Sequence, residues 1–108
     1  NKGARPMELL LLGVGGCTAY DVLTILLKAR QKVSECSVEI QATRAEKIPK
    51  VFTHIHMHYV VIGDHLQPKQ IQRAIDLSAN KYCSASIMLQ QTVAISHDFS
   101  LIQRTDGS

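Results

Sequence analysis

The feature that most constrains this chain of 108 residues is an apolar run over residues 9–27. Pro6 stands where a first helical turn tolerates its missing N–H, and residues 7–32 favour one long helix with basic residues near its end. Asp21 lies near the middle of the run, and a charge at membrane depth costs about 2.5–3.5 kcal/mol on insertion scales. The run therefore predicts a central, buried helix that a partner could cover in part, rather than a membrane span.

Three glycines interrupt this predicted helix. Gly13, Gly15 and Gly16 each disfavour a helix by roughly 1 kcal/mol relative to Ala, so another use must explain them. Close approach of a second helix is one explanation, and a bend beside Cys17 is the other.

The rest of the chain alternates between strand and helix patterns. Period-two alternation predicts strands, and a polar turn at residues 47–50 joins the first two into an antiparallel hairpin. Strands are expected at 33–45, 51–62 and 92–102, and later helices at 69–81 and 85–90, with a junction around Cys83. The predicted fold class is α+β, with a long central helix packed on an antiparallel sheet in the order α-β-β-α-β.

Cysteine usage and charge restrict the class of protein. Three cysteines, Cys17, Cys36 and Cys83, make an odd and sparse set, unlike a secreted disulfide framework, so reduced thiols in the cytoplasm are expected. The net charge of +3 is scattered and Trp is absent, which argues against nucleic-acid binding. No pattern indicates a cofactor, a resident metal or a membrane partner.

Two cysteine settings and the order of elements resemble the OsmC/Ohr family (osmotically inducible protein C and organic hydroperoxide resistance proteins), and within it the YhfA-like branch. The settings are Pro6-Met7-Glu8 leading through an apolar helix into Gly15-Gly16-Cys17-Thr18-Ala19, and Lys81-Tyr82-Cys83-Ser84-Ala85-Ser86. The two cysteines are 66 residues apart, and the resemblance covers about residues 5–102. The resemblance implies an intertwined homodimer with an N-terminal strand layer before the first helix. Residues 1–108 are therefore expected to form a single OsmC-like domain that is N-terminally incomplete.

The resemblance also implies a chemistry: thiol-dependent reduction of organic or hydrogen peroxides in defence against oxidative stress. Cys17 would be the attacking sulfur, Cys83 the resolving one, and an external dithiol the reductant. Glu8 is a third candidate, although the best-studied members carry Glu directly after the proline, where this chain has Met7. Those members also hold the attacking thiolate with an N-terminal Arg, which no Arg of this sequence matches.

Two alternatives stay open. Asp21 shares a helix face with Cys17, four residues away, and a carboxylate there opposes ionisation of a thiol. The chain could thus be a non-catalytic OsmC-like dimer that binds a small apolar ligand between its helices. Strict alternation puts Phe52, His54, His56 and His58 on one strand face. The three histidines could bind zinc, but strand neighbours rarely converge on one ion and no acidic or Cys ligand is near in sequence. A solvated or interface face is the preferred interpretation of these histidines, and of Cys36 a buried structural thiol.

Overall fold

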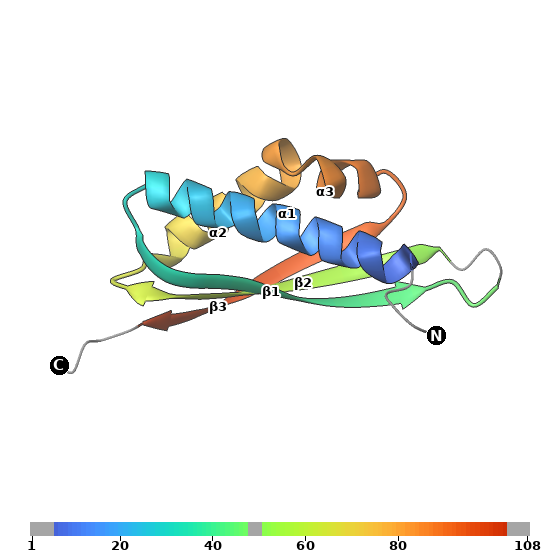
Figure 1. Cartoon of the computed structure of the whole chain (residues 1–108), viewed down its shortest axis with the longest axis horizontal. Helices are drawn as coiled ribbons and strands as arrows, with labels where there is room; N and C mark the ends of the chain where they lie inside the picture. Colours follow the sequence, from blue (N-terminus) through green and yellow to red (C-terminus); the bar gives the residue numbers. More distant parts are fainter. Residues whose placement is uncertain (1–5, 48–50, 104–108) are drawn as a thin grey trace.

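The computed structural model describes residues 6–47 and 51–103 as a two-layer α+β fold, as the sequence predicts. Figure 1 shows the helices on one side of the sheet, while the other side is left open. The elements are α1 (Pro6–Lys28), β1 (Lys32–Arg44), β2 (Phe52–Asp64), α2 (Pro68–Leu77), a π-helical turn η1 (Ser78–Tyr82), α3 (Ser84–Leu89) and β3 (Ala94–Gln103).

The three strands form one sheet in the order β1-β2-β3. β1 and β2 pair antiparallel as a hairpin, which confirms that prediction, although residues 48–50 of its turn lie outside the described residues. β3 pairs parallel to β2, so the sheet is mixed and the expectation of a wholly antiparallel sheet was wrong. The physical reason is the connection: α2, η1 and α3 carry the chain back along the sheet, as parallel pairing requires.

An irregularity at the hairpin end corrects a second expectation. Thr43 pairs with His54 and Arg44 with Phe52, which leaves Thr53 as an extra residue in β2. Such a bulge interrupts the alternation of side chains. Phe52 consequently points into the core with 6% of its surface exposed, instead of sharing the outer face with His54 as strict alternation predicted.

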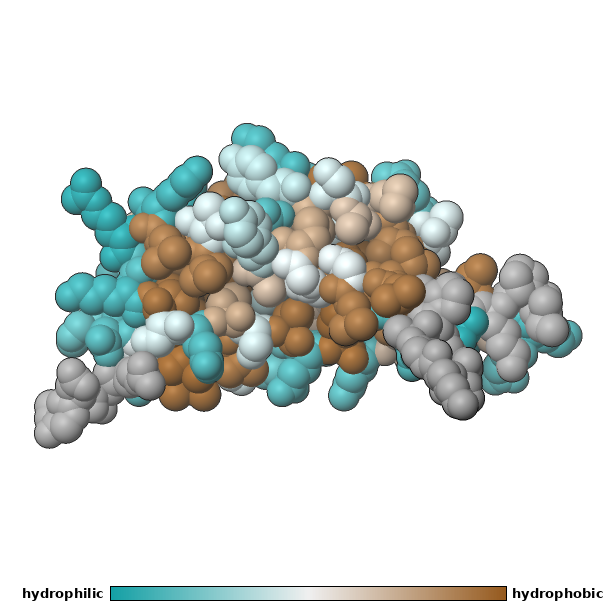
Figure 2. Space-filling view, viewed as in Figure 1, coloured by the Kyte–Doolittle hydropathy of each residue, from teal (hydrophilic) through white to brown (hydrophobic). Residues whose placement is uncertain are grey.

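α1 buries only one of its sides within the chain. Val14, Val22 and Leu26 are buried against the sheet and α2, whereas Leu12 and Tyr20 on the opposite side are 67% and 70% exposed. Figure 2 shows apolar residues gathered on the face that α1 presents. α1 is long and apolar enough to cross a membrane, a criterion that the core helices of soluble proteins also meet. Its packing on the sheet accounts for the apolar residues of its buried side.

The glycines of α1 divide in the same way. A Cβ on Gly15 would lie 2.6 Å from Cδ1 of Ile40, so Gly15 lets α1 approach β1 closely. A Cβ on Gly13 or Gly16 would meet nothing within 4 Å in the described structure. Packing within the chain thus explains Gly15, but it does not explain Gly13 or Gly16.

Candidate active site

Two thiols meet between α1 and the segment that follows η1. Sγ of Cys83 donates a hydrogen bond to Sγ of Cys17 over 2.6 Å, although the residues are 66 positions apart in sequence. Both are free cysteines; Cys17 is half-buried and Cys83 is fully buried. The structure therefore brings together the two cysteines that the family resemblance singled out.

A buried polar network fixes the segments that carry these thiols. Oγ1 of Thr18, the residue after Cys17, lies 2.7 Å from Oγ of Ser78 and 2.7 Å from the hydroxyl of Tyr59. Ser78 begins η1, and its carbonyl accepts a hydrogen bond from the backbone N–H of Cys83 over 2.8 Å. Because each of these three hydroxyls is buried, the network ties α1, β2 and η1 together at one depth in the core.

The π-helical turn explains how α2 delivers Cys83. The sequence predicted one helix over residues 69–81 and a junction around Cys83; the structure ends α2 at Leu77 and inserts η1 before the junction. Such turns are rare and occur frequently at functional sites. Cys83 then adopts an extended backbone, with φ −84° and ψ 99°, which turns the chain into α3.

The environments of the two sulfurs differ. Burial raises the pKa of the Cys83 thiol above its ordinary value, its hydrogen bond to Cys17 adds to that effect, and the backbone amide of Ser86 acts in the opposite direction. Cys83 is thus held as a protonated donor. Cys17 receives its hydrogen bond and is the sulfur more open to solvent.

Asp21 completes a cluster with the two thiols. One carboxylate oxygen of Asp21 and the sulfurs of Cys17 and Cys83 all lie within 4.8 Å of one another, a donor set that could hold a metal ion. Oδ2 of Asp21 is buried and has no hydrogen-bond partner among the described residues. A buried polar atom without a partner is uncommon and calls for an explanation.

Asp21 also lines a pocket of about 490 Å³ between α1 and α2. Ile25 and Leu77 contribute apolar wall, and Lys28 and Arg73 bring two cationic side chains to the same pocket. The pocket therefore offers both apolar surface and positive charge beside the thiol cluster.

Glu8, the third candidate from the sequence, lies elsewhere. It is exposed in the first turn of α1 and lines a separate groove with Leu11 and Val38. Nine residues along a helix correspond to roughly 13 Å of rise and to the opposite side of the helix from Cys17. Within one chain, Glu8 is not brought to the thiols.

Cys36 lies apart from the pair on β1. It is half-buried and packs against the core, and burial raises the pKa of its thiol to about 11. A thiol that stays protonated at neutral pH is a poor nucleophile. These features favour the structural role that the sequence suggested.

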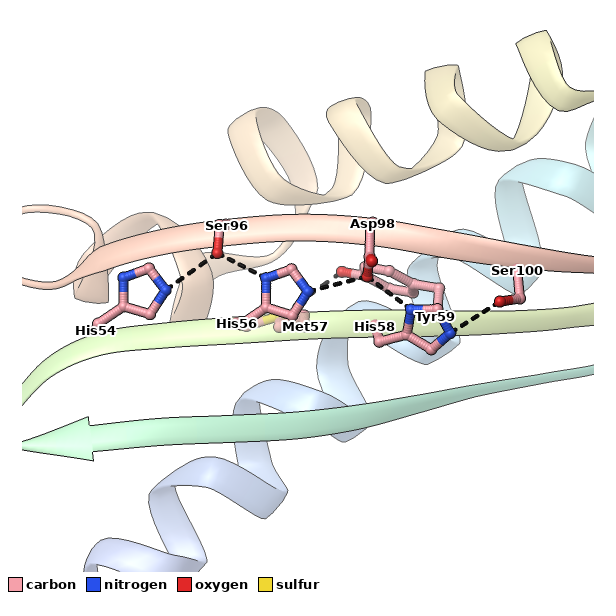
Figure 3. Close-up of polar contacts among 8 residues, drawn as sticks. All are labelled: His54, His56, Met57, His58, Tyr59, Ser96, Asp98 and Ser100. Carbon is pink, nitrogen blue, oxygen red and sulfur yellow. Dashed lines mark hydrogen bonds and ion pairs between the residues drawn. The ribbon is translucent and has the colours of Figure 1, made fainter.

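The histidines of β2 occupy the open face of the sheet. Figure 3 shows His54, His56 and His58 beside Ser96, Asp98 and Ser100 of β3. Oδ1 of Asp98 lies 2.9 Å from Nε2 of His56 and 2.6 Å from Nδ1 of His58. The side chains are exposed or half-buried, as a solvated face requires, and the parallel β2–β3 pairing supplies an acidic neighbour that local sequence did not reveal.

Comparison with known proteins gives a consistent result. The family model described as OsmC-like protein matches residues 1–98. Protein YhfA of Escherichia coli (strain K12) is 44% identical over 102 residues, which cover 94% of this chain and 76% of that relative. The crystal structure of a hypothetical protein from Aquifex aeolicus VF5 matches with a TM-score of 0.91 at 34% identity, over 96% of this chain and 78% of that one.

A more distant structure carries a functional description. The OsmC organic hydroperoxide resistance protein of Legionella pneumophila matches with a TM-score of 0.74 at 13% identity, over 93% of this chain and 72% of that one. At this identity the likeness shows the fold alone. The family match and the similarity to YhfA confirm the family predicted from the two cysteine settings: the chain belongs to the OsmC-like family.

Proposed function

We propose that this protein reduces organic hydroperoxides and hydrogen peroxide with a two-cysteine centre, in which Cys17 attacks and Cys83 resolves. The observation that carries the proposal is the 2.6 Å approach of the two sulfurs, with Cys17 the more exposed of them. The description of the Legionella pneumophila neighbour as a hydroperoxide resistance protein gives further support.

The reaction follows from these positions. The Cys17 thiolate attacks the terminal oxygen of ROOH, the O–O bond breaks, and RO⁻ leaves and takes up a proton to become the alcohol, while Cys17 becomes a sulfenic acid. The Cys83 sulfur then attacks the Cys17 sulfur, its thiol proton leaves with the hydroxyl group as water, and a disulfide forms. An external dithiol returns both cysteines to thiols and becomes a disulfide itself.

The setting of this chemistry is part of the proposal. The cytoplasm is the compartment that keeps thiols reduced and supplies dithiol reductants. The three cysteines of the chain are free. Because Cys17 and Cys83 lie together in one chain, a catalytic cycle needs only the peroxide and an external reductant, and we propose that it takes place in the cytoplasm.

The assembly we propose is a homodimer formed through α1. The exposed side of α1 carries large apolar residues, among them Leu9, Leu12 and Tyr20. Gly13 and Gly16 leave open space on this helix, and small residues allow two helices to approach closely. A second copy of the chain would bury this side and make α1 the central helix that its sequence predicts.

A second candidate function is binding of a small ligand without turnover. The pocket of about 490 Å³ beside Asp21 favours it, because apolar walls and the cations Lys28 and Arg73 suit a ligand with an apolar body and an anionic end. Burial raises the pKa of the Cys83 thiol, and the carboxylate of Asp21 adds to that effect, which opposes ionisation of this sulfur.

Steady-state consumption of cumene hydroperoxide with a dithiol reductant separates the two candidates. We expect turnover in the wild type, abolished by Cys17→Ser and slowed at least tenfold by Cys83→Ser. Cys36→Ser is the matched control and should leave the rate unchanged. A folded wild-type protein without turnover would contradict the peroxidase proposal and favour ligand binding.

A further inference from the structure

The position of Asp21 is not explained by peroxide reduction. A thiolate at Cys17 is a negative charge, and a carboxylate within 4.8 Å of it repels that charge. Oδ2 of the same carboxylate is buried without a hydrogen-bond partner among the residues described. Lys28 and Arg73 line the adjoining pocket, yet neither hydrogen-bonds this oxygen among the described residues; a cation held between the two sulfurs and the carboxylate would give the carboxylate a partner.

We propose that Cys17, Asp21 and Cys83 bind one zinc ion in the reduced protein, and that oxidation of the two thiols releases the ion. Sulfur and carboxylate ligands suit Zn²⁺, which prefers four ligands in a tetrahedron. Three protein ligands leave one position for water, which can enter from the pocket that Asp21 also lines. The sequence alone gave no reason to expect a metal here, because Cys83 joins the other two ligands only in the fold.

The backbone places the three ligands suitably. Cys17 and Asp21 are four residues apart on α1, so they project from one side of the helix. Cys83 approaches from a second segment with an extended backbone, outside any helix. Two sulfurs on one tetrahedral zinc ion at about 2.3 Å lie about 3.8 Å apart, so the thiols must separate by roughly 1 Å when the ion binds.

Zinc binding releases protons from the two thiols, and oxidation of the two thiolates releases the zinc ion. Binding displaces one proton from each thiol. The two thiolates and the carboxylate together carry one negative charge more than Zn²⁺ carries positive charge, and the cations Lys28 and Arg73 of the adjoining pocket can offset it. On oxidation the two thiolates give two electrons to ROOH, which takes up two protons and becomes ROH and water, while the sulfurs form a disulfide. A disulfide offers no thiolate ligand, so Zn²⁺ leaves. Binding stands independently of peroxide turnover, whereas release rests on the proposed function.

The test uses the full-length chain, reduced and stripped with a chelator, then titrated with Zn²⁺ in competition with a coloured indicator. We expect one zinc per chain, loss of binding in Cys17→Ser and Cys83→Ser, and at least tenfold weaker binding in Asp21→Asn, which keeps the shape of the side chain. Co²⁺ in place of Zn²⁺ should give the absorption band of sulfur-to-cobalt charge transfer. Cys36→Ser and His56→Gln are controls and should bind zinc as the wild type does.

The outcomes separate the two proposals. Absence of zinc binding in the wild type, binding retained in Cys83→Ser, or loss of binding in His56→Gln would overturn the zinc site; the last result would move the ion to the open face of the sheet. One equivalent of cumene hydroperoxide should release the ion from the loaded protein. Zinc that stays bound after a Cys17–Cys83 disulfide has formed contradicts the release step. Zinc binding without any disulfide or turnover supports the site and contradicts the peroxidase function.

Discussion

The two faces of the sheet differ in how far their hydrogen-bonded polar side chains are exposed to solvent. On the face covered by helices, Thr18, Tyr59 and Ser78 form a network whose members are all buried. On the open face, His56 and His58 share Asp98, whose side chain is 58% exposed. A buried hydroxyl has no water to replace a lost partner, whereas an exposed imidazole does. Polar contacts of similar length therefore contribute differently to stability on the two faces. The thiols lie on the covered face, where the loss of a hydrogen bond costs more.

The largest effect is expected from Thr18→Val, which keeps the shape of the side chain and removes the hydroxyl at the centre of the buried network. The hydroxyls of Ser78 and Tyr59 lose their shared partner, and an unsatisfied buried polar group costs about 1–3 kcal/mol. We expect the free energy of unfolding to fall by roughly 2–4 kcal/mol, measured by urea denaturation.

Thr53→Val is the matched control for this variant. The hydroxyl of Thr53 is exposed and donates to the carbonyl of Thr43 over 3.1 Å. Its removal should change stability by less than about 0.5 kcal/mol. Equal losses of unfolding free energy in Thr18→Val and Thr53→Val would contradict the claim that buried polar contacts contribute more to stability than exposed ones.

A smaller effect on stability is expected from the protonation of His97. This residue precedes Asp98 on β3 but lies on the covered side of the sheet, with its ring 6.0 Å from that of Tyr59. Burial lowers the pKa of His97, and His56 adds to this, while Asp76 acts in the opposite direction. The folded state thus binds fewer protons than the unfolded state between the lowered pKa and the ordinary value of 6.5. Stability should fall as the pH drops below 6.5 and level off below the lowered pKa.

His97→Phe tests this assignment, since it removes the titrating group and a buried ring nitrogen that has no hydrogen-bond partner among the described residues. Urea unfolding between pH 7.5 and 5 should show a flatter profile for the variant than for the wild type. A profile unchanged by the substitution would assign the acid sensitivity to another group.

The smallest effect is expected from Asp98→Asn on the open face. Its hydrogen bond with His58, then that with His56, holds the pKa of Asp98 below its ordinary value of 3.8. A lowered carboxyl pKa contributes stability above the unfolded value, and this contribution is lost as pH falls through the lowered value. At pH 7 the urea midpoint of Asp98→Asn should shift less than that of Thr18→Val, and the shift should vanish in strong acid. A larger shift than Thr18→Val causes would reverse the ranking of the faces.

The sequence predicted the elements of this fold better than it predicted their pairing. Period-two alternation located β1, β2 and β3, but alternation carries no information on strand direction, so the parallel β2–β3 pairing was missed. The position of Phe52 was missed because a single extra residue in β2 shifts every earlier side chain to the other face.

The candidate site was predictable in part, for a related reason. Cys17 and Cys83 were found through their settings in a family pattern, not through any local rule that brings residues 66 positions apart into contact. Thr18, Ser78 and Tyr59 gave no signal beyond the place of Thr18 next to Cys17, because their hydrogen bonds span 41 and 60 positions. Asp21 was noticed as a helix neighbour of Cys17, but its closeness to Cys83 and its unpartnered oxygen depend on the fold.

The central claim is that Cys17 and Cys83 act as one redox pair. Its most direct test is peptide mass spectrometry of the reduced, metal-free protein after treatment with a sub-stoichiometric amount of cumene hydroperoxide and rapid alkylation. We expect a Cys17–Cys83 disulfide as the first product, with Cys36 still a free thiol. Both cysteines recovered as unmodified thiols, or a disulfide that includes Cys36 instead, would contradict it.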